Sequence, residues 1–313
     1  MAYYWSPISD KNGRVIFKKT DKKIRRKDQT LEDEMSFFDH LEVLRWHFIR
    51  SLAVLFAFTI VAFLNREIVF DKILFGPKSV DFWTYRQMCK LGDMLNIGGI
   101  CIEEIPFTLM NTQMVGQFTL HITSSLVVGF ILAFPYILWE IWRFIRPALY
   151  SNEKKYSTGF VFFSSMLFGM GVLFGYFIFV PLSISFLSNY IVSDIVTNQY
   201  TLSNYISTVA TLTLAAGLIF ELPIVIYFLS KVGIITPSIM KRNRRYAIVI
   251  ILIVSAVITP SADVLTQVVV ATPLLILYEI SIFVSGYVVR KNKEKEEEEL
   301  AEDSRGNYRE LED

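Results

Sequence analysis

The sequence predicts an all-α, polytopic membrane protein. Of its 313 residues, 53% are hydrophobic, and the mean hydropathy is +0.42. A helix needs about 20 apolar residues to cross the hydrocarbon core of a bilayer, and the chain contains a series of long apolar runs. Its lysines and arginines are gathered in a few segments between those runs. Lipid is therefore the expected solvent for most of the chain.

Six apolar runs are expected to span the membrane, at 46–64, 118–141, 158–187, 206–229, 246–258 and 265–288. The fifth is short, because about 13 residues reach only about 20 Å. Either the bilayer thins beside it, or the helix ends partway and its neighbours shield it. Pro135, Pro181, Pro223 and Pro273 lie inside four of the other spans. Proline kinks predict a curved, concave wall, although membrane helices also tolerate proline without any functional meaning.

The basic segments predict that both chain ends lie in the cytoplasm. Lysine and arginine are frequent between spans two and three and between spans four and five, and they are absent after spans three and five. Basic loops remain on the cytoplasmic side. The expected parts are a basic cytoplasmic arm at 1–45, a transmembrane domain at 46–288 with a long outside loop at about 65–117, and a charged, disordered cytoplasmic tail at 289–313.

The outside loop contains both cysteines, Cys89 and Cys101. Disulfides persist in oxidising compartments, so we expect these two residues to be bridged. The alternative is a pair of free cysteines packed in an amphipathic loop.

Two acidic residues lie within the expected spans, Glu221 in the fourth and Glu279 in the sixth. Charged groups inside a membrane are costly and are candidates for function. Glu221 either has a proton-linked or docking role, or it is a hydrogen-bonded carboxyl that holds helices together.

The sequence lacks the usual motifs of enzymes and cofactor sites. It has no CxxC, HExxH or Gly-x-Ser-x-Gly motif and no phosphate-binding glycine loop. Its histidines, His40, His47 and His121, are too scattered to predict a metal site. We therefore expect no catalytic residue, no metal, no cofactor and no nucleic-acid partner, and we treat a membrane-embedded enzyme as a rival hypothesis only.

Several segments resemble one family, the TatC proteins of the twin-arginine protein translocase. The stretch FDHLEVLR at 38–45 resembles the family's His-Leu-x-Glu-Leu-Arg signature, and FPYILWEIWRFIRPALY at 134–150, followed by Glu153, resembles its most diagnostic stretch. Further similarities follow in order at 220–223, 233–237 and 259–267. The resemblance covers about 40–285.

The resemblance implies a receptor for signal peptides that carry two adjacent arginines on folded cargo proteins. It assigns signal-peptide binding to Glu153, Phe144, Leu41, Glu42, Leu44 and Arg45. It assigns the docking of TatA-type and TatB-type single-span subunits to Thr259 and Gln267, and it implies self-association, a bacterial cytoplasmic membrane and a proton gradient as the energy source.

The chain departs from the family pattern at two positions of the first motif. Val43 stands where a carboxylate is usual, with Glu42 one place earlier, which moves the charge by about 100° around a helix. His47 stands where an arginine is common, which weakens the positive charge there at neutral pH. The alternative function is a proton-coupled small-molecule transporter that uses Glu221, although no internal repeat of the kind that such transporters often show is visible.

Overall fold

The computed structural model describes residues 5–9, 15–19, 37–95, 107–145, 157–191, 193, 198–258 and 264–312. The described part is mostly helical. The chain forms two compact units, Met1–Trp46 and His47–Asp313.

The first unit contains a small hairpin. Strands β1 (Trp5–Ser9) and β2 (Val15–Lys19) pair antiparallel, with Trp5 opposite Lys19 and Ser9 opposite Val15. The unit ends within the first turns of α1 (Phe37–Leu64).

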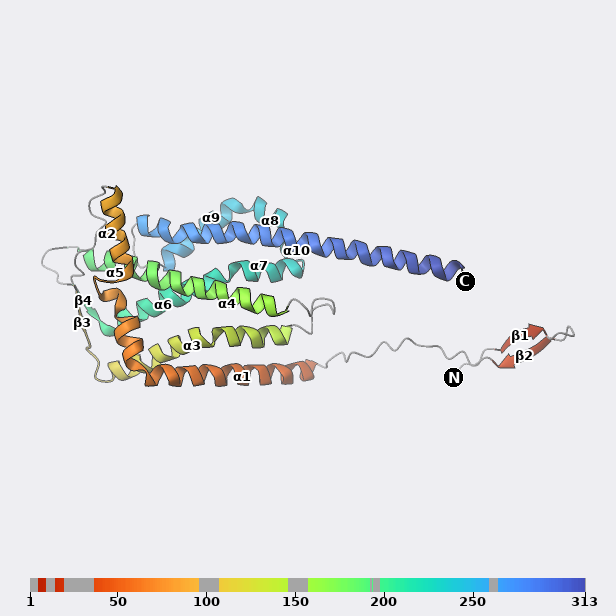
Figure 1. Cartoon of the computed structure of the whole chain (residues 1–313), viewed down its shortest axis with the longest axis horizontal. Coiled ribbons are helices and arrows are strands. Elements are labelled where there is room, and N and C mark those ends of the chain that lie inside the picture. The colour runs from red at the N-terminus through yellow and green to blue at the C-terminus, as the bar shows by residue number, and fades with distance from the viewer. Residues whose placement is uncertain are drawn as a thin grey trace. The chain divides into compact units, whose positions relative to one another are not determined.

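The second unit holds the long helices (Figure 1). Its elements after α1 are, in chain order, the π-helix η1 (Ile68–Leu74), the 3-10 helix η2 (Gly76–Lys78), α2 (Trp83–Leu95), β3 (Thr108–Met110), α3 (Gly116–Ile145), α4 (Ser157–Phe174), the π-helix η5 (Gly175–Phe179), α5 (Val180–Asn189), β4 (Gln199–Thr201), α6 (Leu202–Phe220), α7 (Leu222–Lys231), α8 (Pro237–Arg242), α9 (Arg244–Ile258) and α10 (Val264–Glu312). Strands β3 and β4 pair in parallel.

Five helical stretches in the described residues are long and apolar enough to cross a membrane: Glu42–Leu64, Gly116–Ile145, Val161–Asn189, Leu202–Lys231 and Gln267–Glu294. They correspond to five of the six expected spans. The remaining expected span corresponds to α9, whose 15 residues cover about 22 Å.

Glycines bring α4 and the start of η5 into close contact with α6. A Cβ atom at Gly171 would lie 2.7 Å from the carbonyl oxygen of Ala216, and one at Gly175 would lie 2.7 Å from the Ala216 Cβ. Gly217 is as tightly packed, against Phe168. Small residues allow helices in lipid to approach this closely and to gain van der Waals contact.

The third span changes its helical form before Pro181. The π-helix η5 separates α4 from α5, and Pro181 has no N–H to donate to the carbonyl of Phe177. The hydroxyl of Thr84 in α2 donates to that carbonyl. The buried Tyr85 hydroxyl donates toward the carbonyls of Pro77, at 3.0 Å, and Pro181, at 3.2 Å. Helix α2 is thereby fixed to the proline-containing segment.

The fourth span is broken at Glu221, between α6 and α7. Pro223 falls in the first turn of α7, where a missing N–H costs nothing. Gly233, with φ of 82°, lies in the connection that follows the end of α7 at Lys231. The Thr236 hydroxyl then caps the start of α8 by accepting from the Ile239 N–H. Helix α7 packs along α10, where buried Ser230 donates to Ser285 at 2.7 Å.

Helix α10 continues through 289–312, where we expected a disordered tail. The segment is rich in lysine and glutamate, and Arg290 pairs with Glu294 one turn later at 3.4 Å. Pairs with this spacing support a helix that has no packing partner. Composition alone does not distinguish such a helix from a solvated, disordered segment.

Candidate functional site

A buried carboxylate joins α1 to α3 beside the stretch that the resemblance singled out. Glu140 is only 1% exposed. Its Oε2 atom bonds Nδ1 of His47 in α1, and its Oε1 atom accepts from the Tyr136 hydroxyl at 2.8 Å. Tyr136 lies one helical turn before Glu140 on the same face of α3. Both carboxylate oxygens therefore have partners, as a buried charge requires.

Phe144 lies one turn after Glu140 and meets the other side of the same histidine. The Phe144 and His47 ring centroids are 6.1 Å apart, at an interplanar angle of 65°. Edge-on packing of this kind is a favourable aromatic geometry. On the exposed side of α3, the Arg143 guanidinium lies 5.7 Å from the Trp139 ring centroid. The end of α3 thus offers aromatic and cationic groups, one of which, Phe144, contacts α1 through His47.

Glu140 was missed in the sequence, and the signal that could have found it was present. It lies in the apolar run Leu-Trp-Glu-Ile-Trp, just inside the expected end of the second span. The rule that selected Glu221 and Glu279, an acid within an apolar helix, applies equally to Glu140.

The remaining residues expected to bind a signal peptide are only partly described. Glu42, Leu44 and Arg45 are exposed in the first unit, with Leu44 at 42%. Glu153 and the side chain of Leu41 lie outside the described residues.

Glu221 is buried and has one hydrogen-bond donor. It is 8% exposed, and the Ser164 hydroxyl of α4 donates to its Oε2 atom at 2.6 Å. Its Oε1 atom has no partner within the described part of the chain, and neither do the buried hydroxyls of nearby Ser165 and of Thr213 in α6. The fourth span therefore carries a buried carboxyl, one of whose oxygen atoms has no hydrogen-bond partner among the described residues.

Glu279 and Gln267 both connect α10 to α9. Glu279 accepts from Arg244 at 2.5 Å, and its side chain is 43% exposed. The Gln267 amide donates to the Leu252 carbonyl at 3.0 Å. Glu279, expected to lie within the sixth span, is thus an ion-paired group on the exposed side of α10. Thr259 lies outside the described residues.

Cys89 lies in α2 and is disulfide-bonded. Cys101, its expected partner, lies outside the described residues, so their pairing stays a prediction. Elsewhere in the described part, no group of three or more His, Cys, Asp or Glu side chains could hold a metal ion.

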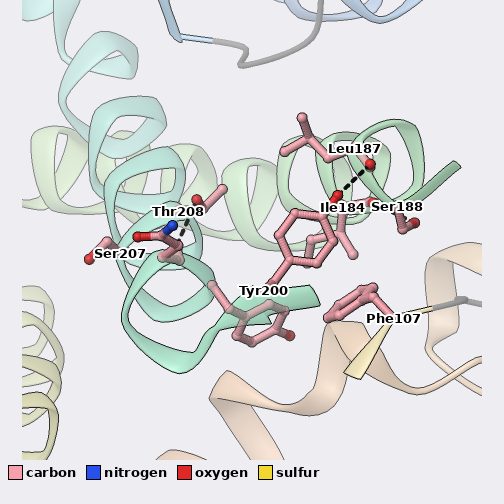
Figure 2. Close-up of a pocket in the computed structure, with 9 residues that line it drawn as sticks. Phe107, Ile184, Leu187, Ser188, Tyr200, Ser207 and Thr208 are labelled. Carbon is pink, nitrogen blue, oxygen red and sulfur yellow. Dashed lines mark hydrogen bonds between the residues drawn. The ribbon is translucent and has the colours of Figure 1, made fainter. Parts of the chain in front are cut away.

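A cavity of about 350 Å³ lies between α5, β4 and the start of α6 (Figure 2). Phe107, Ile184 and Leu187 form its apolar part. The hydroxyl groups of Tyr200 and Thr208 are turned to the protein itself, with Tyr200 donating to the Leu187 carbonyl at 2.6 Å and Thr208 to the Asn204 carbonyl at 2.8 Å. The hydroxyl groups of Tyr200 and Thr208 thus bond the backbone around the cavity. Neither the charge nor the arrangement of the lining residues indicates a catalytic site.

Comparisons with known proteins identify the family. Residues 39–273 match the family described as Sec-independent protein translocase protein (TatC). The chain is 41% identical over 262 residues to the Sec-independent protein translocase protein TatC of Blattabacterium sp. subsp. Periplaneta americana, covering 83% of this chain and 98% of that protein. It is 48% identical over 174 residues to the protein of the same name from Aquifex aeolicus, covering 55% and 72%.

A solved structure agrees with this assignment. The crystal structure of the twin arginine translocase receptor TatC is similar with a TM-score of 0.60 and 38% identity, over 80% of this chain and 99% of that one. The chain is therefore a multi-pass membrane protein that belongs to the TatC family of Sec-independent protein translocase proteins.

Proposed function

We propose that this chain is the twin-arginine signal-peptide receptor of its translocase and the core around which the translocase assembles. The family consists of protein translocase components rather than enzymes. The observation that carries the proposal is the end of α3, where Phe144 packs on His47 beside the buried His47–Glu140 pair. This end belongs to the diagnostic stretch 134–150, which leads directly to Glu153.

Glu153 receives the arginine pair. A carboxylate and a guanidinium form charge-assisted, bidentate hydrogen bonds, which favour arginine over lysine. Phe144 packs beside the bound peptide, and Leu41, Glu42, Leu44 and Arg45 add contacts from the start of α1. Glu42 takes over part of the role of the carboxylate that Val43 replaces.

The membrane arrangement completes the proposal. Both termini lie in the cytoplasm, and α9 is a short sixth crossing beside a locally thinned bilayer. The apolar part of the signal peptide slides along the concave wall of kinked helices, and the transmembrane proton gradient supplies the work.

TatA-type and TatB-type subunits dock at α9 and α10. The support is an apolar face of α9 that is open in this chain, with Val249, Ile253 and Val257 each more than half exposed. Thr259 and Gln267 lie at the ends of these helices, and polar groups between helices in lipid contribute about 1 kcal/mol. The receptor also associates with further copies of itself.

Glu221 assists translocation from within the fourth span, where its Oε1 atom has room for a further donor. The alternative that we weighed, a small-molecule transporter with Glu221 as the proton carrier, finds no support in the comparisons, which give protein translocase components.

Photocrosslinking tests the receptor function. A photoreactive residue at position 153 should crosslink a labelled signal peptide that carries two arginines and should fail with a matched peptide in which both are lysines. Glu153→Lys should abolish peptide capture. Glu298→Lys, a change at an exposed glutamate in the extension of α10, should leave it unchanged. Equal crosslinking of the arginine and lysine peptides would refute the receptor assignment.

A further inference from the structure

The imidazole of His47 lies between two groups of α3, and it touches both. Glu140 bonds its Nδ1 atom, and Phe144 packs edge-on against the ring. Glu140 and Phe144 are four residues apart, so they lie on one face of α3. The hydrogen bond to Glu140 fixes the orientation of the His47 ring. The Phe144 ring then packs against this oriented imidazole.

Several charged or titratable groups lie near this pair, and Arg50 of α1 acts electrostatically on Glu140. From α1, Arg50 is exposed, and from α3, Arg143 is exposed and lies over the Trp139 ring. Tyr136 donates to Glu140 as a neutral group. Among the described residues, His47 is therefore the basic side chain that bonds Glu140. Glu140 is only 1% exposed, so little water could take the place of His47 as its partner.

Histidine, unlike the arginine common at this position in the family, changes its charge between pH 5 and 8. The protonated ring forms an ion pair with Glu140, whereas the neutral ring offers only a single uncharged N–H. A hydrogen bond between charged partners is substantially stronger than one with a neutral donor. The junction between α1 and α3 is therefore tighter when His47 is protonated.

We propose that His47 is a positioning residue of the signal-peptide receptor, which holds Phe144 in its peptide-binding orientation through Glu140 and makes capture of the peptide depend on pH. This inference rests on the receptor function proposed above. His47 itself need not touch the peptide.

The first experiment follows Phe144 without any ligand. A fluorinated phenylalanine at position 144 is observed by 19F NMR between pH 5.5 and 8.5 in the full-length protein. The resonance should titrate in wild type and should stay constant in His47→Arg, whose charge does not change. His121→Gln, at the other end of α3, is the matched control and should titrate like wild type. A constant wild-type resonance, or equal titration in His47→Arg, would overturn the inference.

The second experiment measures the affinity for a histidine-free twin-arginine signal peptide over the same pH range. Wild type should bind about tenfold more weakly at high pH than at low pH, as expected when a charged hydrogen bond becomes a neutral one. His47→Arg should bind equally at both ends of the range, and His47→Gln should bind weakly throughout. Failure of wild type to prefer arginine over lysine peptides at any pH would contradict the receptor function and not the positioning role. A preference for arginine with identical pH profiles in wild type and His47→Arg would contradict the positioning role alone.

Discussion

Thr84 donates its hydroxyl proton to the backbone carbonyl of Phe177, the carbonyl to which Pro181 has no N–H to offer. Thr84 and Phe177 are 93 positions apart, and they connect the loop helix α2 to the π-helix η5 in the third span. The donor comes from a segment that lies outside the apolar spans, so the loop takes part in holding the membrane domain together.

Thr84→Val should destabilise the protein by about 1–3 kcal/mol, because the Phe177 carbonyl loses a donor in a buried place while the side-chain volume barely changes. The apparent Tm in detergent measures the effect. Thr84→Ser retains the hydroxyl and should stay close to wild type. An unchanged Tm for Thr84→Val would show that the bond contributes nothing to stability.

Gly171→Ala should separate α4 from α6, since the added Cβ would lie 2.7 Å from the carbonyl oxygen of Ala216. Overpacking of this kind costs about 1–3 kcal/mol, which SDS titration of the folded protein can measure. Gly169, two residues earlier in the same helix, has no atom within 4 Å of its Cβ position. Gly169→Ala is thus the matched control and should be neutral or slightly stabilising, because alanine favours helix over glycine. Equal losses for the two variants would argue against the close contact.

Ser164→Ala should cost about 1–3 kcal/mol, because Glu221 loses its only hydrogen-bond donor among the described residues. The same serine substitution should cost less when Glu221→Leu is already present, since no carboxyl is then left unsatisfied. A double-mutant cycle by SDS titration tests this coupling, and strictly additive losses would refute it. Under the proposed function, Glu221→Gln should keep the fold and reduce transport of a folded cargo in vesicles.

Arg244→Glu should lower stability by only about 0–1 kcal/mol if the pair behaves as a surface ion pair, because both partners of the Arg244–Glu279 pair are nearly half exposed. Reversal of both charges, with Arg244→Glu and Glu279→Arg together, should restore the wild-type Tm. The difference between single and double variants should shrink as salt rises. A loss of several kcal/mol in the single variant would show that this pair is shielded from water.

Local sequence patterns predicted the long helices well. The expected run 46–64 ends at Leu64, where α1 ends, and the expected run 118–141 lies within α3, Gly116–Ile145. These boundaries follow from hydropathy and length, which are local properties. At Pro223 the sequence predicted a kink, and the structure has a break in the helix at Glu221, between the end of α6 and the start of α7.

Contacts between distant segments were beyond the reach of the sequence. The His47–Glu140 pair joins residues 93 positions apart. Neither of the two motifs alone shows that His47, which stands where the family commonly has an arginine, bonds Glu140. The contact of the π-helix η5 with Thr84 of another segment, through the Phe177 carbonyl, could not be predicted either. The helix through 289–312 was missed because its charge pattern suits both a helix and a solvated coil.

The interruption at Glu221 divides the fourth span between two neighbours. Its first half, α6, packs on α4 through the glycine contacts, while its second half, α7, packs on α10 through Ser230 and Ser285. The two helix pairs also pack against each other beside this break, since Phe220 of α6 lies in one buried cluster with Leu274 and Leu277 of α10. Glu221 is therefore both the buried acid of the fourth span and the residue at which the chain passes from one helix pair to the other.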